Sequence, residues 1–275
     1  MKKAFTLVEL LVVIGIIGIL SGVLIASFSG SSESARAAKC LTNLKNLASA
    51  SQLYASAKTW LPQSSSSTYL LDDVDDGNWY DETPGWVSWL SSGMFPSQSD
   101  VWGTEIGTYH ENEEDRIYSL TNGVLWTCLS GTSSAYVCPE HVDAVAPAFR
   151  PLWSYVMNSG VSGWKYKSVT RADRRLLFAE MPFDGTVNGN YAPSTSKSKY
   201  NDCALQYWEG DVIGFNHKAG KGEKCAHVVF VDGHVEKLRQ PKDGLNDTQL
   251  QELTQWLCEG KDISFDGKKY EKLAD

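Results

Sequence analysis

The sequence predicts an α+β protein in which a long N-terminal helix packs on a head built from an antiparallel β-sheet. Two patterns carry this prediction: an apolar N-terminal run passes into an amphipathic helical pattern, and short apolar segments separated by Gly, Asn and Asp follow in the second half. We expect a leader, an apolar transmembrane helix, its amphipathic continuation, a loop-rich insertion, a sheet head, and a C-terminal helix with a hairpin. Their expected bounds are 1–4, 5–28, 29–60, 61–130, 131–240 and 241–275.

The composition is that of a globular chain with an acidic surface. Of the 275 residues, 42% are hydrophobic and 21% are charged, so a sizeable core can form. The net charge of -8 argues against nucleic acid as a partner, because phosphate binding needs a basic surface. The six cysteines contain no Cys-x-x-Cys pair, which removes the strongest zinc and redox motifs.

Residues 5–28 form an apolar run that carries a single charge, on Glu9. The run exceeds the roughly 20 residues that span a bilayer core, and it is longer than the roughly 7–15 apolar residues of a secretory signal peptide. It therefore predicts a transmembrane helix. A carboxylate deep in hydrocarbon costs about 3 kcal/mol or more, but the helix dipole favours it in a first turn. An interfacial Glu9 without any task is the alternative.

The apolar run contains three glycines, at spacings of three and four residues. Gly15, Gly18 and Gly22 would form a small-residue stripe along which helices can approach closely. The same spacing is common in single-span anchors, so it does not by itself indicate assembly.

The helical pattern continues beyond the apolar run. Apolar residues recur at three- to four-residue spacing from Leu41 to Ala57, which predicts a helix with one apolar face. Pro62 ends the pattern, because proline cannot continue the hydrogen-bond ladder. A continuous helix from Phe5 to about Thr59 would span roughly 80 Å.

The segment "KKAFTLVELLVVIGIIGIL" resembles the class III signal of type IV pilin-like proteins. The resemblance implies cleavage by a prepilin peptidase between Ala4 and Phe5, N-methylation of Phe5, and Glu9 as the fifth residue of the mature chain. Ala4 stands where Gly is the family norm. The resemblance also implies a pilin-like subunit, in which a long helix lies half in the membrane and half against a globular head. In an assembly of such subunits, Glu9 would pair with the amino terminus of a neighbouring subunit.

Further segments resemble one branch of these proteins, the prepilin-type processing-associated His-X9-Asp-Gly family, which is common in planctomycetes. The resemblance covers about residues 1–62 and 131–240. One departure is that 14 residues rather than nine separate His217 from Asp232. The matching positions are Cys40, Asn43, Leu44, Lys45, Tyr54, Pro62, Cys138, Pro139, Tyr155, Met157, Asn158, Phe178, Ala179, Glu180, His217, Asp232, Gly233, His234 and Val235.

The clearest strand signal is "CAHVVFVDGHVEKL". Its apolar alternation around Asp232-Gly233 predicts a β-hairpin with a two-residue turn. The stretch "ISFDGKKYE" near the end repeats this device. His217, His227, Asp232 and His234 are residue types that bind zinc. The turn already accounts for Asp232-Gly233, so we expect structural histidines, no metal and no catalytic residues.

The insertion is rich in Ser, Gly, acids and tryptophans, which favours loops with buried Trp side chains. Two functional readings compete with this one. The tryptophans could stack on sugar rings, and carboxylates supply the oxygen ligands that calcium prefers, although their spacing does not fit an EF-hand. The residues concerned are Trp79, Trp86, Trp89 and Trp102 for sugars, and Asp72, Asp73, Asp75 and Asp76 for Ca2+. We expect no other cofactor.

An exported head favours oxidised cysteines. We expect a disulfide between Cys40 on the helix and Cys138 in the head, with the other four cysteines paired among themselves. Six cysteines allow 15 connectivities, so the sequence leaves other pairings open.

Together these features predict a pilin-like structural subunit and not an enzyme. We expect a single-pass inner-membrane protein with its head outside the cytoplasm, which assembles with its own copies and other pilin-like subunits. The product would be a type IV pilus or a type II secretion pseudopilus. The alternative is a single-span anchored extracytoplasmic binding protein, with glycans as the ligand class that the tryptophans suggest.

Overall fold

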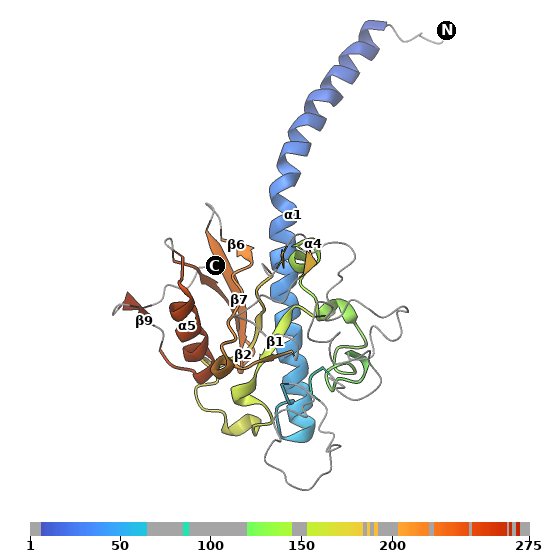
Figure 1. The fold of residues 1–275 in the computed structure, drawn as a ribbon. Helices are drawn as coiled ribbons and strands as arrows, with labels where there is room; N and C mark the ends of the chain where they lie inside the picture. The colour runs from blue at the N-terminus through green and yellow to red at the C-terminus, as the bar shows by residue number, and fades with distance from the viewer. Residues whose placement is uncertain are drawn as a thin grey trace.

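The computed structural model describes residues 7–64, 85–87, 120–144, 153–183, 186–187, 190–191, 203–219, 223–241, 244–262, 264–265 and 268–269. Only the backbone is described for residues 22–31, 143–144, 186–187, 190–191, 209, 264–265 and 268–269. These residues form a long N-terminal helix and a sheet in which antiparallel pairs predominate, as the sequence predicts. Figure 1 shows one end of the helix lying against the head and the other end projecting away from it.

Helix α1 (Leu7–Lys58) is a single α-helix of 52 residues, about 80 Å long. It ends at Thr59, which adopts a left-handed conformation (φ 75°) and donates its N–H to the carbonyl of Ala55 at 2.7 Å. Pro62 follows three residues later, as the sequence predicts. Among the described residues, no helix combines the length and the apolar character needed to cross a membrane. The predicted span, residues 5–28, lies partly outside the described side chains.

The main sheet has six strands in the order β5-β1-β2-β7-β6, with β8 also paired to β7. Strand β5 pairs with β1 in parallel, which differs from the antiparallel sheet that we expected. Parallel neighbours need a long connection rather than a hairpin. The chain between β1 and β5 meets this need, because it includes β2 and then more than 20 further residues. The strands are β1 (Tyr155–Asn158), β2 (Leu176–Glu180), β5 (Ala204–Leu205), β6 (His217–Lys218), β7 (Lys224–Phe230) and β8 (Val235–Arg239).

Two short antiparallel ribbons lie outside this sheet. Strands β3 (Thr186–Val187) and β4 (Asn190–Tyr191) form one, and β9 (Ser264–Phe265) and β10 (Lys268–Lys269) form the other. The second ribbon coincides with the stretch "ISFDGKKYE".

The arrangement of strands around β7 positions the side chains discussed below. Strand β8 pairs with β7 along Cys225–Val229, so it occupies one edge of β7. Strands β2 and β6 must therefore share the opposite edge, with β2 beside Val228–Phe230 and β6 beside Lys224–Cys225. The end of β2 and the start of β6 consequently meet next to the middle of β7.

The hairpin between β7 and β8 is formed as predicted, but its turn is longer than two residues. Phe230 N–H donates to the carbonyl of His234 at 3.0 Å, and Gly233 N–H donates to the carbonyl of Phe230 at 2.9 Å. Val231 is thereby included in the loop. Gly233 has a φ of 91°, a conformation that glycine adopts without a steric penalty.

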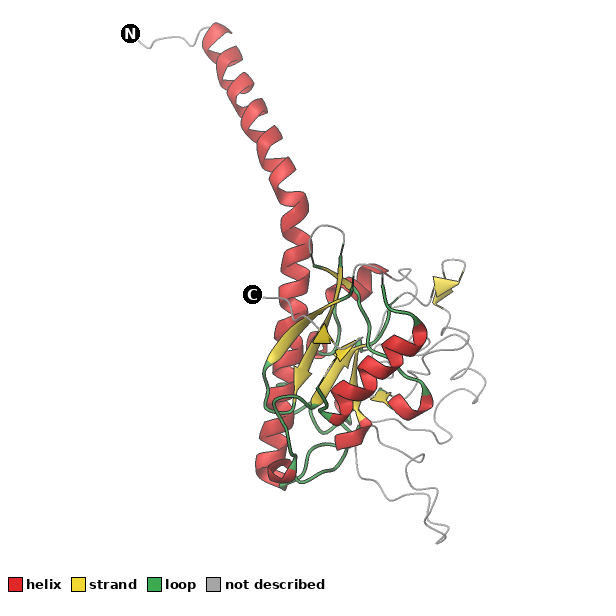
Figure 2. Ribbon diagram, turned by 90° about the vertical axis from the view of Figure 1, so that its left-hand side faces the viewer, coloured by secondary structure: helices red, strands yellow, loops and turns green. Residues whose placement is uncertain are grey.

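Two layers of helix cover the sheet, as Figures 1 and 2 show. Helix α1 packs on β7, β2 and β8, and α5 (Asp247–Glu259) packs on β2. A capping box between Asn246 and Gln249 begins α5, and Gly260 in the left-handed conformation ends it. The remaining elements are α4 (Pro139–Ala144) and the 3-10 turns Ser133–Ala135, Ser159–Val161, Tyr166–Ser168 and Tyr207–Glu209.

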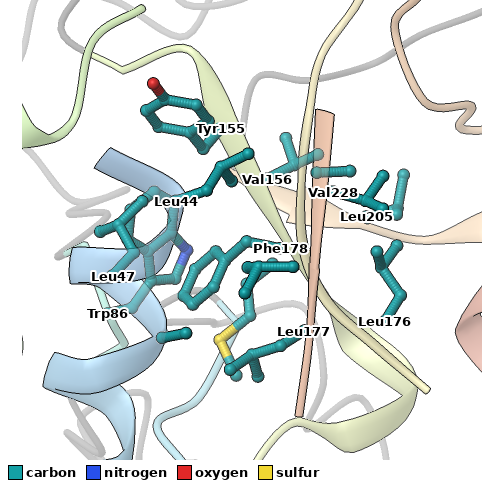
Figure 3. Packing of buried hydrophobic residues seen from close by; sticks show 14 of the residues in the cluster. Leu44, Leu47, Trp86, Tyr155, Val156, Leu176, Leu177, Phe178, Leu205 and Val228 are labelled. Carbon is teal, nitrogen blue, oxygen red and sulfur yellow. The ribbon is translucent and has the colours of Figure 1, made fainter. Parts of the chain in front are cut away.

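Buried apolar side chains pack on both faces of the sheet, and Figure 3 shows those between α1 and the strands together with Leu176 and Leu205 beyond them. Leu44 and Leu47 of α1 are fully buried there, in agreement with the predicted apolar face. Trp86 stacks on Tyr136 at 5.7 Å and meets the edge of Phe178 at 5.1 Å, and its Nε1 donates to the carbonyl of Cys203. Trp86 is therefore a core residue rather than a sugar-stacking one. Trp79, Trp89, Trp102, Asp72, Asp73, Asp75 and Asp76 lie outside the described residues.

Candidate functional site

The first candidate site is the end of α1 that projects from the head, Leu7–Leu20, which we call the projecting segment (Figure 1). Eleven of its 14 residues are large apolar side chains, with exposed fractions from 45% at Val13 to 79% at Leu7. Such a run of exposed apolar side chains is far larger than monomeric soluble proteins normally present to water. The exposed residues are Leu7, Val8, Leu10, Leu11, Val12, Val13, Ile14, Ile16, Ile17, Ile19 and Leu20.

The other three residues of the projecting segment are the ones that the sequence singled out. Glu9 is exposed and lies in the first turn of α1, where the helix dipole favours a negative charge. A Cβ atom added to Gly15 or Gly18 would meet no atom within 4 Å. Within the subunit, therefore, neither glycine is required for packing. Ala4 and Phe5 lie outside the described residues, and Gly22 is described only by its backbone.

The second candidate site is a buried cluster between α1 and the sheet. It consists of Cys40 on α1, Glu180 at the end of β2, His217 at the start of β6 and His227 in β7. All four residues are at most 2% exposed, and one potential ligand atom of each lies within 4.8 Å of those of the other three. We call this set the buried cluster.

The sheet register explains why three of these side chains meet. His217 pairs with Cys225, and Val228 pairs with Ala179, the residue before Glu180. Glu180 therefore lies across from His227. Side chains two residues apart on a strand share a face, so His227 points to the same side as Cys225 and its partner His217. Helix α1 covers that face and contributes Cys40.

Hydrogen bonds connect most of the cluster. Cys40 Sγ donates to Glu180 Oε1, and the same oxygen lies 2.7 Å from His217 Nε2. Tyr155 donates its hydroxyl to Cys40 Sγ at 3.5 Å. Cys138, which directly precedes α4, lies with its Sγ 3.6 Å from His217 Nε2. The side chain of Cys138 thus borders the cluster.

His227 joins the cluster mainly through its ring. It stacks on His217 with the ring centroids 3.9 Å apart, and its Nε2 lies 3.9 Å from Cys225 Sγ. Three polar atoms of the cluster are buried without a hydrogen-bond partner: Glu180 Oε2, His217 Nδ1 and His227 Nδ1. Such atoms are uncommon in native proteins and call for an explanation.

The mutual proximity of these groups shifts their pKa values. Burial raises the pKa of the Cys40 thiol well above its usual value, with Cys138 and Glu180 adding to the effect. Burial alone would lower the pKa of His217, but the hydrogen bonds to Cys138 and Glu180 outweigh it and raise the pKa to about 10. Burial would raise the pKa of Glu180, but His217 holds it below its usual value. Burial lowers the pKa of His227 to about 3.

The charge state at neutral pH follows from these directions. His217 is protonated and paired with ionised Glu180, whereas His227 is neutral. A buried ion pair of this kind is retained only where its hydrogen bonds compensate the loss of water.

The structure brings together the two cysteines that the sequence paired. Cys40 Sγ donates to Glu180 Oε1, and Cys138 Sγ lies 3.6 Å from His217 Nε2, which contacts the same oxygen. All six cysteines of the chain are free thiols in the structure. The predicted disulfide between them therefore stays a prediction.

The structure divides the histidines and acids that the sequence grouped. His217 and His227 meet in the buried cluster, but Asp232 and His234 lie at the β7–β8 turn. There, His234 Nδ1 contacts Asp232 Oδ1 at 2.5 Å, its ring stacks on Phe230, and Gln52 of α1 donates to the carbonyl of Val231. These contacts show that the Asp232-Gly233 turn packs against α1 and has a structural role.

Sequence reasoning gave Glu180 no role of its own and did not join His227 to Cys40. A signal was present, because Glu180 is the one charged residue at the end of the apolar strand Leu176–Glu180. A charged residue that continues a fully buried strand needs a partner. The partner could not be named without the strand register.

Comparison with known proteins bears on the N-terminus. Residues 1–25 match the family described as the prokaryotic N-terminal methylation motif. This match supports a prepilin-type pilin or pseudopilin as the class of protein, and it agrees with the predicted signal. The His-X9-Asp-Gly branch stays a prediction. No curated protein and no solved structure matches the chain.

Proposed function

We propose that this chain is a structural subunit that assembles through the projecting segment into a type IV pilus or a type II secretion pseudopilus. The observation that carries the proposal is the projecting segment itself, where eleven large apolar side chains are exposed on a helix continuous with the head. The N-terminal methylation motif covers the same residues. The activity is self-association, and the chain is not an enzyme.

The free energy of burial supports this function. Burying a Val, Leu or Ile side chain contributes about 1.5–3 kcal/mol, so covering the partly exposed segment would contribute on the order of 15 kcal/mol before the costs of association. No element of the described head approaches the projecting segment to cover it (Figures 1 and 2). The cover must then come from lipid before assembly and from neighbouring subunits after it.

Processing would prepare the chain for assembly. Prepilin peptidase would cleave between Ala4 and Phe5, and Phe5 would become the methylated amino terminus. Until assembly, residues 5–28 would hold the subunit in the inner membrane as a single pass, with the head outside the cytoplasm. Its partners would be further copies of this chain and other pilin-like subunits.

Glu9 would then select the register of neighbouring helices. In a bundle of apolar helices its carboxylate would leave water, and an isolated charge there costs about 3 kcal/mol or more. The new amino terminus at Phe5 of a neighbour supplies an opposite charge at a fixed place. In the unassembled subunit Glu9 lies only four residues after Phe5, so its carboxylate would reach the membrane–water interface and needs no partner charge.

The test is a Glu9→Ala variant expressed in the native host and compared with the unmodified chain. We expect filaments and crosslinked oligomers to be lost, while the variant still reaches the membrane and its head resists proteolysis. Glu9→Gln should behave in the same way, because it keeps the size of the side chain and removes the charge. Electron microscopy of sheared fractions and chemical crosslinking of membranes supply the two measurements.

Glu33→Ala is the matched control, because Glu33 lies on the same helix but contacts Lys218 of the head at 3.0 Å. It should assemble normally. Unchanged oligomers in Glu9→Ala would remove the role assigned to Glu9. An unmodified chain that stays monomeric in its membrane would remove the assembly function and favour an anchored binding protein.

A further inference from the structure

The buried cluster contains more unsatisfied polar groups than hydrogen bonding within the head accounts for. Glu180, His217 and His227 each have a buried polar atom without a partner. A buried polar group without a hydrogen bond costs about 1–3 kcal/mol, and a charged one costs more. Three such atoms in neighbouring residues leave the cluster with polar groups that its own side chains do not satisfy.

We propose that Cys40, Glu180, His217 and His227 form a structural binding site for one divalent transition-metal ion of the zinc type. The ligand atoms of a tetrahedral zinc site with bonds of 2.0–2.3 Å lie about 3.3–3.8 Å apart. The four candidate atoms here lie within 4.8 Å of one another. The atoms are therefore close to coordination distance, and binding would also turn the rings of His217 and His227 out of their present stacked arrangement, so that both face the ion.

The residue types favour zinc over other common ions. Thiolate and imidazole are the ligands that zinc prefers, whereas calcium and magnesium take oxygen ligands almost exclusively. The charges also balance, since a thiolate, a carboxylate and two neutral imidazoles together neutralise a divalent cation. Binding requires Cys40 as the thiolate and both histidines in the neutral form, and any proton displaced from these groups would pass to solvent.

The burial of the site indicates a structural rather than a catalytic metal. Catalytic zinc sites keep one coordination position open for water or substrate, whereas structural sites are closed by four protein ligands. Here four protein residues are available, and none of them is more than 2% exposed.

The origin of the ligands defines what the metal would do. Cys40 comes from α1, and the other three ligands come from the sheet, one each from β2, β6 and β7. Cys40 and Glu180 are 140 residues apart in the chain. A metal at this position would link α1 to the sheet of the head. If the projecting segment is held in an assembly, as the proposed function requires, force on the helix would reach the head through this link.

A disulfide between Cys40 and Cys138 would compete with metal binding. The Sγ atom of Cys138 lies 3.6 Å from His217 Nε2 at the border of the cluster, and oxidation of Cys40 and Cys138 to a disulfide would remove the thiolate ligand. The metal site and the Cys40–Cys138 disulfide therefore exclude each other in any one molecule.

The experiment uses the full chain in detergent under reducing conditions. The protein is stripped with a chelator, incubated with Zn2+ and dialysed, and its metal content is measured by elemental analysis. We expect about one zinc per chain and a Tm higher by roughly 5–10 °C than that of the stripped protein. Co2+ in place of Zn2+ should show the visible absorption and the thiolate charge-transfer band of a tetrahedral site that contains a cysteine ligand.

Two pairs of variants locate the ion. Cys40→Ser should lose the thiolate band, while Cys258→Ser, which alters another buried free cysteine, should keep it. His227→Gln should lose the bound metal, while His141→Gln, which alters a buried histidine outside the cluster, should keep it. These controls separate loss of a ligand from a general weakening of the core.

Three results would overturn the proposal. The first is an unmodified chain that retains no zinc after dialysis. The second is metal retained equally by Cys40→Ser and His227→Gln. The third is a Cys40–Cys138 disulfide in most molecules when thiols are blocked during isolation from the native membrane.

Discussion

The two ends of α1 differ in an unexpected direction. The projecting segment is the more apolar of the two, yet its side chains are exposed. The segment Cys40–Ala55, which we call the packed segment, is more polar, yet half of its residues are buried. Buried positions of the packed segment recur at helical spacing and include small and polar residues. They are Cys40, Asn43, Leu44, Leu47, Ala48, Ala50, Ser51 and Ala55.

The difference shows that the packed segment already has its partner. Asn43, fully buried, donates its side-chain amide to the carbonyls of Ser134 and Val137 at 3.0 and 2.9 Å. A polar side chain tolerates such burial because its donors are satisfied. The projecting segment has no comparable set of contacts, so its partners must come from outside the subunit.

The largest expected effect is on the free energy of unfolding, when a leucine is replaced by alanine in each of the two segments. Leu44→Ala should lower the free energy of unfolding of the head by about 2–5 kcal/mol, because it leaves a cavity in the core. Leu11→Ala in the projecting segment should change it by less than about 0.5 kcal/mol, because Leu11 is 60% exposed. Denaturant unfolding of the full chain in detergent measures both. Equal effects would show that the segments are not different in the subunit.

A smaller effect concerns a buried histidine of α4, the short helix that packs beside α1. His141 of α4 is 2% exposed, stacks on Phe183 at 4.2 Å and lies 2.9 Å from Ser154 Oγ. Burial lowers the pKa of His141 from 6.5 to about 4, against the attraction of Glu180. As the pH falls, the unfolded chain takes up this proton first, so stability present above pH 6.5 is lost toward about pH 4. The loss should reach about 2 kcal/mol between about pH 7 and pH 5.

His141→Gln tests this assignment, because glutamine does not titrate in that range. The variant should be less stable at pH 7 but should lose less stability between pH 7 and pH 5 than the unmodified chain. The slope of the free energy of unfolding against pH is the measurement. An unchanged slope would mean that other groups cause the acid sensitivity.

The smallest effect on the isolated subunit is expected in the projecting segment. Gly18→Ala should leave its Tm unchanged or slightly higher, since the added methyl meets nothing within 4 Å and alanine favours a helix by about 1 kcal/mol. If neighbouring helices approach along the glycine stripe, the same substitution should reduce filament yield. Normal filaments together with an unchanged Tm would show that Gly18 faces lipid or solvent in the assembly.

Several features of the fold could be predicted because they depend on local patterns. The 3.6-residue periodicity and Pro62 gave the length of α1, and the alternation around Asp232-Gly233 gave the β7–β8 hairpin. The prepilin-type signal is also local, since it consists of consecutive residues whose order carries the meaning. The extra residue in the β7–β8 turn was missed because Val231 is β-branched and apolar, so the sequence pattern places it at the end of the strand rather than in the turn.

The rest required distant segments to meet. The parallel pairing of β5 with β1 depends on a long connection that has no periodic signal. Trp86 could not be assigned to the core until Tyr136 and Phe178 were placed around it. The buried cluster depends on β2 and β6 sharing one edge of β7, which no short stretch of sequence encodes.

The sequence by itself determined a helix with an apolar end and a carboxylate in its first turn, because helix formation and hydrophobic patterning act over a few residues. Only the tertiary structure decided which part of that helix is buried and which side chains surround Cys40. The physical reason is that burial depends on the surface that arrives from elsewhere. Glu180, His217 and His227 reach Cys40 from 140 or more residues away, through strand pairing and not through their own neighbours in the chain.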